Sequence, residues 1–96
     1  MRLQLLPQAR IDILDAIAAF EDLAEGLGER FEDELFACFG RIKSDPELFA
    51  KNSLGFRASR LDKFTAVVYF QEKNESDSVI VFRVCVNGRS GDQVEC

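Results

Sequence analysis

Five cationic side chains in the second half of the chain are the candidates for chemistry on a phosphate. Guanidinium and ammonium groups bind phosphate oxygens and stabilise the extra negative charge of a phosphorane. Cleavage of RNA through its 2′-hydroxyl also needs a base and an acid. The chain has no histidine, and its single tyrosine, Tyr69, lies in an apolar run. The five cations are Arg57, Arg60, Lys63, Arg83 and Arg89.

The spacing of these cations limits how many of them one surface can hold. Successive residues of a strand point to opposite faces of a sheet. Arg57 and Arg60 are three positions apart, so a regular strand places them on opposite faces unless it bulges. Two interpretations without catalysis are therefore also open for these cations. The cations are solvated strand residues, or they contact phosphate without doing chemistry.

The missing histidine and the cysteine count exclude several kinds of site. Without histidine there is no Ser-His-Asp or Cys-His catalysis and no histidine-ligated metal. The 3 cysteines are an odd number, which fits no closed disulfide framework and favours a reducing cytoplasm. No apolar run approaches the roughly 18 residues of a membrane span. We expect a cytoplasmic protein with no metal, no cofactor and no membrane contact.

The charge is divided unevenly along the sequence. Residues 1–50 carry 5 basic and 11 acidic side chains, whereas residues 51–96 carry 7 basic and 6 acidic ones, for a net charge of −5. An acidic chain is a poor general binder of nucleic acid, because phosphate contacts need lysine and arginine. A protein partner fits this balance better, although a local basic patch is compatible with it.

Periodicity predicts the elements that position these residues. Residues 2–6 alternate in polarity and predict a strand that Pro7 ends. Helical spacing follows from Gln8, is interrupted at Gly26 and Gly28, and resumes until about Lys43, which predicts a helical hairpin. Strand-like runs follow at 55–61, 64–71 and 78–86.

The predicted order is β-α-α-β-β-β, with the helices segregated from an antiparallel meander. This order defines the α+β class: a helical hairpin packed on a sheet that contains the meander. The first strand must join the same sheet, since a lone strand leaves its backbone groups unpaired. At 96 residues we expect one domain over 1–96, with a frayed tail at 89–96.

Five segments stand out along this order: Gly26–Leu35, Ile42–Phe49, Phe56–Phe64, Tyr69–Phe70 and Val84–Arg89. The first is similar to the GLGERFxxEL run, and the second to the I-x-x-x-P-E-x-F run, of ParE-like toxins. Together the segments resemble the ParE/RelE superfamily of type II toxin–antitoxin systems over roughly residues 3–89, with a ParE-like helical half. Asn87 stands where that superfamily usually has histidine.

The resemblance implies a RelE/ParE-like fold, a cognate antitoxin and two alternative activities. ParE-like members are associated with inhibition of DNA gyrase, and we expect this activity, with Arg57, Arg60 and Arg89 as contacts to the target. RelE-like members cleave mRNA on the ribosome. The alternative is therefore an mRNA endonuclease that uses Arg57, Arg60, Lys63 and Arg83. A degenerate, non-toxic interaction domain is the third reading.

An antitoxin would need an apolar surface or a free strand edge on this chain. Two helices on a small sheet leave some aromatic positions uncovered, and an exposed apolar patch marks a partner site. The candidates are Phe36, Phe39 and Phe49, whose alternative reading is ordinary core. An antitoxin segment could also add a strand to the edge of the sheet.

Overall fold

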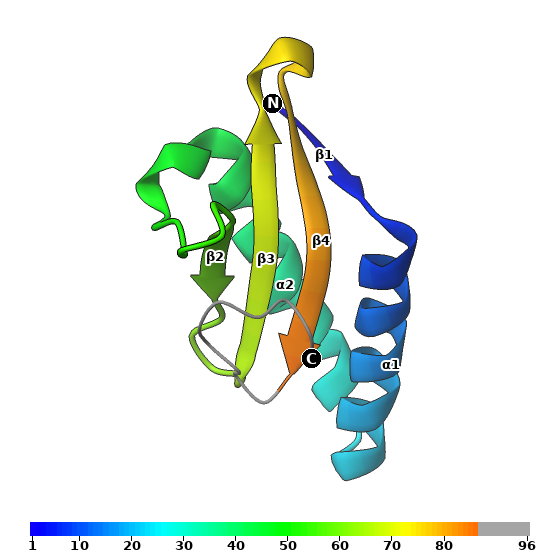
Figure 1. Cartoon of the computed structure of the whole chain (residues 1–96). Helices are drawn as coiled ribbons and strands as arrows, with labels where there is room; N and C mark the ends of the chain where they lie inside the picture. The colour runs from blue at the N-terminus through cyan, green and yellow to red at the C-terminus, as the bar shows by residue number, and fades with distance from the viewer. Residues whose placement is uncertain (87–96) are drawn as a thin grey trace.

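The computed structural model describes residues 1–86, so the predicted tail and two of the residues named above, Asn87 and Arg89, lie outside it. The predicted β-α-α-β-β-β order is confirmed (Figure 1). Two short 3₁₀ helices, η1 (Pro46–Leu48) and η2 (Asn74–Ser76), interrupt the connections. The main elements are β1 (Arg2–Leu5), α1 (Pro7–Leu23), α2 (Leu27–Ser44), β2 (Arg57–Arg60), β3 (Ala66–Lys73) and β4 (Ser78–Val86).

The strands form one mixed sheet in the order β1-β4-β3-β2. The last three strands are an antiparallel meander, as predicted, and β1 joins them parallel to β4. β1 and β2 are therefore the two edges. β1 is short and its pairing ends at Leu5, which lies opposite Val81, so within residues 1–86 the rest of β4 has no strand beside it on that side.

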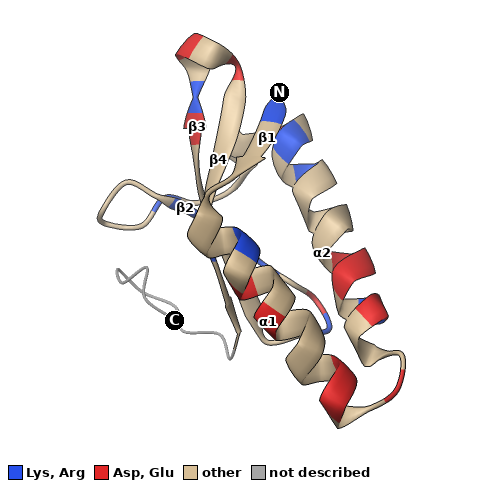
Figure 2. Ribbon diagram, turned by 90° about the vertical axis from the view of Figure 1, so that its right-hand side faces the viewer, with Lys and Arg blue, Asp and Glu red and all other residues tan. Residues whose placement is uncertain are grey.

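α2 covers one face of the sheet, α1 lies against α2 and alongside β4, and both helices bury one core with the sheet (Figures 1 and 2). The stripe of α2 that faces the sheet includes Phe31, Leu35 and Ile42, which are fully buried. It packs against the alternate residues of β3 that point the same way, Val68 and Phe70. Burying each of these large side chains contributes roughly 1.5–3 kcal/mol.

Two glycines allow the tight turn between the helices, each for a different reason. Gly26 has a φ of +84°, a conformation that L side chains rarely adopt. Gly28 is helical, but a Cβ there would stand 2.7 Å from the carbonyl oxygen of Ile17. The carboxylate of Glu21 accepts hydrogen bonds from the N–H groups of Gly26 (2.9 Å) and Gly28 (3.0 Å). The glycine motif is thereby explained by helix packing alone.

Some element boundaries differ from the sequence prediction. β2 is limited to four residues, because Lys51 pairs with Arg57 and Asn52 turns the preceding loop back on itself. β3 starts and ends two residues later than predicted, whereas β4 has the predicted bounds. Cys85 is buried and packs with Val67 and Tyr69.

The two glycines of α2 that lack a positive φ give opposite predictions. Gly28→Ala should lower the free energy of unfolding by about 1–3 kcal/mol, because its Cβ meets backbone that cannot yield cheaply. Gly40→Ala should raise it by up to about 1 kcal/mol, since nothing lies within 4 Å of that Cβ and alanine favours the helix. Urea unfolding of both variants measures the difference, and an equal effect would contradict the close helix contact.

Candidate functional site

A cavity of about 650 Å³ lies beside β2, between the end of α2 and the loop that precedes the strand. Three basic side chains border it, Arg41, Lys51 and Arg60, together with one acidic residue, Asp62. We call it the cationic pocket. Its remaining lining is largely apolar or small and includes Phe49, Ala50, Asn52, Ala58, Ser59, Val67 and Tyr69.

The strand β2 places Arg60 at this pocket and directs Arg57 elsewhere. The β2–β3 register is regular, and it pairs Arg60 with Val67 and Ala58 with Tyr69. Ala58, Val67 and Tyr69 pack together on the sheet face away from the helices. Alternation therefore puts Arg60 on that face and Arg57 on the other.

The loop before β2 is held in place by Asn52. Its Oδ1 accepts hydrogen bonds from the N–H groups of Leu54 and Phe56, both at 3.0 Å. With the oxygen fixed, the direction of the amide nitrogen is fixed as well. That Nδ2 is buried and has no hydrogen-bond partner among the described residues. A buried donor without an acceptor costs about 1–3 kcal/mol, so it marks a place where an acceptor would be favourable.

Beneath the pocket wall, α2 meets β2 through a polar contact in the core. The Cys38 thiol and the Ser59 hydroxyl are 3.3 Å apart. Burial raises the pKa of Cys38, an effect that Ser59 and Arg41 only partly offset. The thiol therefore stays protonated near neutral pH and is not a nucleophile.

Arg57, a predicted target contact, is engaged within the fold. Its guanidinium lies 2.6 Å from the carboxylate of Glu72 on β3, with both side chains 12% exposed. It also donates a 2.6 Å hydrogen bond to the carbonyl oxygen of Phe49. Arg57 thus fastens the segment after α2 to the sheet, and this segment forms one wall of the cationic pocket.

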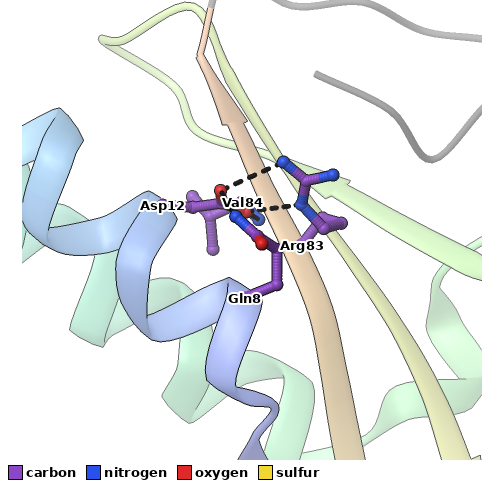
Figure 3. A network of polar contacts seen from close by, with 4 residues as sticks. All are labelled: Gln8, Asp12, Arg83 and Val84. Atoms are coloured by element: carbon purple, nitrogen blue, oxygen red, sulfur yellow. Dashed lines mark hydrogen bonds and ion pairs between the residues drawn. The ribbon is translucent and has the colours of Figure 1, made fainter.

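Arg83 is engaged in the same way at the opposite side of the sheet (Figure 3). Asp12 of α1 accepts hydrogen bonds from the Arg83 guanidinium (2.8 and 3.1 Å) and from the N–H of Val84 (3.0 Å). Gln8 adds a further bond to the same carboxylate. Burial would raise the pKa of Asp12, but these hydrogen bonds outweigh it and lower the pKa below its ordinary value of 3.8.

Lys63 lies apart from Arg60, although only two residues separate them. It borders a different cavity with Arg30, Asp33, Glu34 and Phe64, and its N–H donates to the carboxylate of Glu34. The four cations proposed for an endonuclease thus divide between two cavities and two ion pairs. Of these four cations, only Arg60 borders the cationic pocket.

The three aromatic candidates for antitoxin binding differ in exposure. Phe36 is 55% exposed, whereas Phe39 is 7% exposed and belongs to the core. Phe49 is half-buried and packs edge-on against Phe70, with ring centroids 5.5 Å apart. Beside Phe36, a groove runs along α2 and η1, lined by Ala37, Gly40, Arg41, Ser44, Asp45, Leu48 and Phe49. Leu48 of η1 is 80% exposed, so Phe36 on α2 and Leu48 on η1 both carry uncovered apolar surface near this groove.

Acidic side chains gather at the end of the hairpin where the helices join (Figure 2). Exposed members of this group are Asp22, Glu25, Glu29 and Asp33. Among residues 1–86 no three histidine, cysteine or acidic side chains converge as a metal site. Within the same residues, no helix is long and apolar enough to cross a membrane.

The helical hairpin on a four-stranded mixed sheet is a ParE/RelE-like fold, in agreement with the sequence resemblance. Among solved structures, a chain described as "Chromosomal ParDE TA system from P. aeruginosa" matches with a TM-score of 0.71. The match covers 90% of this chain and 95% of that chain at 16% sequence identity, so it establishes the shared fold. No protein-family model and no curated protein matches the sequence.

Sequence reasoning missed three residues of the pocket: Arg41, Lys51 and Asn52. They lie on a helix end and a loop, at least eight residues before Arg60 in the sequence. No local periodicity relates such positions. The one available signal was Asn52 itself, since asparagine in a loop commonly bonds the backbone two residues on.

The ion pair of Asp12 gives a pH-dependent prediction. Asp12→Asn should lower the free energy of unfolding by about 2 kcal/mol, the usual range for hydrogen bonds to a charged group. Because the folded pKa is lowered, the contribution is present above the ordinary value of 3.8 and is lost as pH falls through the folded pKa. The difference from wild type should therefore be constant from about pH 5 to 8 and shrink below about pH 4.

Asp15→Asn is the matched control, since Asp15 lies on the same helix, is exposed and has no ion pair among the described residues. Urea unfolding across this pH range measures both variants. A loss of stability that is equal for the two, or that does not change with pH, would contradict the role of Asp12.

Proposed function

We propose that this chain is the toxin component of a type II toxin–antitoxin system. In this proposal it is ParE-like, inhibits DNA gyrase in the cytoplasm and is neutralised by a cognate antitoxin. The observation that carries the proposal is the fold shared with the ParDE chain over nearly the full length of both chains. The ordered segments from Gly26 to Arg89 that resemble ParE-like toxins agree with this shared fold.

The charge distribution supports a protein as the target. The exposed acidic end of the hairpin repels the phosphates of a nucleic acid. The basic residues of the second half are only partly available to a target, because Arg57 and Arg83 each bind a carboxylate of the fold. A protein surface offers basic groups to the acidic hairpin, whereas RNA offers none.

The endonuclease alternative requires several cations and a proton donor around one phosphate. Arg57 and Arg83 are held by Glu72 and Asp12, and Lys63 borders a different cavity from Arg60. The only tyrosine, Tyr69, is 1% exposed. This arrangement favours binding over RNA cleavage.

The proposal predicts growth arrest with lost DNA supercoiling when the chain is induced alone in a bacterial host. The purified chain should inhibit supercoiling by gyrase, and the protein encoded beside its gene should restore both growth and supercoiling. Plasmid topology and mRNA integrity are measured in the same cells. Cleaved mRNA that Arg60→Ala abolishes would replace this proposal with the endonuclease, and the absence of arrest would leave a non-toxic interaction domain.

We further propose that the antitoxin covers the apolar surface of α2 around Phe36. Phe36→Ala should weaken antitoxin binding roughly tenfold or more, as expected for an aromatic anchor. Thermal unfolding should change little, because this side chain is 55% exposed in the chain alone. Titration calorimetry with the purified antitoxin measures the affinity.

Leu23→Ala is the control for this experiment. Leu23 is 75% exposed and lies at the other end of the helical layer. This variant also removes exposed apolar surface, and it should keep wild-type affinity if the antitoxin contacts the region of Phe36. Equal losses for Phe36→Ala and Leu23→Ala, or no loss for either, would contradict the proposed surface.

A further inference from the structure

We propose that the cationic pocket binds a carboxylate side chain carried by an extended segment of a partner protein, which pairs with the free part of the β2 edge. The inference does not depend on the toxin assignment, since it rests on the pocket's own residues. Three features carry it: two cations, Lys51 and Arg60, that no side chain among residues 1–86 engages, a fixed amide donor, and a part of the β2 edge that these residues leave uncovered.

The charge of the pocket is opposite to that of the chain. Arg41, Lys51 and Arg60 border it against the single acid Asp62, whereas the whole chain has a net charge of −5. Within the described residues, no ion pair or side-chain hydrogen bond engages Lys51 or Arg60. Arg57 and Arg83, by contrast, are both neutralised by carboxylates. Lys51 and Arg60 are thus cations that the described part of the fold does not use, whereas Arg41 also acts on the Cys38 thiol.

Asn52 adds a neutral donor to these charges. Its Oδ1 is held by Leu54 and Phe56, which leaves the unpartnered Nδ2 as the free end of the amide. A group with several acceptor oxygens would satisfy this donor and two cations together. Carboxylates and phosphates have that chemistry, and their hydrogen bonds to cations are stronger than neutral ones.

The edge of β2 favours a peptide as the carrier of that group. The N–H of Leu61 bonds across to Ala66, and the N–H of Ala58 bonds outward to Ala50. Alternation therefore directs the N–H of Arg60 outward too, past the point where the loop at residues 50–52 covers the strand. A short extended segment can pair with this uncovered part, as in strand addition.

The remaining lining favours a single carboxylate over a polyanion. Phe49, Ala50 and Val67 are apolar and suit the methylene stem of a glutamate or a neighbouring aliphatic residue. Asp62 repels a second anionic group that comes close to the first. The overall negative charge opposes the approach of RNA, whose every nucleotide carries a phosphate, far more than that of a peptide with one carboxylate.

The test is an NMR titration of the full isotope-labelled chain with a blocked pentapeptide of threonine, valine, glutamate, valine and threonine. The backbone amide of Arg60 and the side-chain amide of Asn52 should shift and reach saturation. The same peptide with glutamine in place of glutamate should bind roughly tenfold more weakly. A uridine trinucleotide serves as the competing class of ligand.

Substitutions separate the pocket from the general charge of the chain. Arg60→Gln and Lys51→Gln should each weaken the glutamate peptide about three- to tenfold and leave the glutamine peptide almost unchanged. Lys43→Gln is the matched control, since Lys43 is an exposed cation two residues from Arg41 and does not border the pocket. Asp62→Asn should strengthen binding, because it removes the repelling carboxylate.

Several outcomes would overturn the proposal. Equal affinity for the two peptides would show that the pocket does not distinguish a carboxylate from an amide. Shifts confined to residues other than Arg60 and Asn52 would place the contact elsewhere. Tighter binding of the trinucleotide would make the pocket a phosphate site. An equal loss in Lys43→Gln and Arg60→Gln would reduce the effect to net charge. The amide spectrum of each variant shows whether that variant is folded. If Arg60→Gln or Lys51→Gln does not fold, Asp62→Asn still tests the proposal, because weaker or unchanged binding of the glutamate peptide by this variant would contradict it.

Discussion

The arrangement of helices and sheet depends on the hydrogen bonds that the Asp12 carboxylate of α1 accepts from β4. β1 covers β4 only as far as Val81, after which the chain turns into α1. Further along, the N–H of Val84 faces α1 instead of a strand, and Asp12 supplies the oxygen that a strand would have offered. The same carboxylate binds Arg83, so one helix residue closes the strand edge and fixes α1 against β4. The contact joins residues 71 positions apart, on the first helix and the last strand of the described chain.

The second constraint is the close approach of the two helices, and it changes how the glycine motif is understood. Gly26 is required by its positive φ and Gly28 by the carbonyl of Ile17, while Glu21 binds both backbone N–H groups. The glycines of the segment thus serve the turn between the helices, and Phe31 and Leu35 belong to the core. The segment is therefore a reliable sign of the fold and says little about the activity, since one fold can carry several functions.

The sequence predicted what local periodicity can encode and missed what depends on distant pairing. The helices follow from apolar spacing, and β4 from a run of β-branched residues, so their bounds were predicted closely. The shortness of β2 was not foreseen, because it follows from the hydrogen bonds of Asn52 and the pairing of Lys51. The partners of Arg57 and Arg83, Glu72 and Asp12, lie on other elements, so no spacing rule could separate these arginines from Arg60.

The difference between arginines that are paired within the fold and those that are not determines which basic residues can bind a partner. An arginine whose charge is already matched by a buried carboxylate would leave that carboxylate unpaired if it turned to a ligand, and an unpaired buried charge costs several kcal/mol. Arg57 and Arg83 are in this position, with partners 12% and 9% exposed. Arg60 and Lys51 can bind an anion without such a loss. Two of the cations that the described fold leaves unmatched, Lys51 and Arg60, lie together at one edge of the sheet, where a partner can bind them.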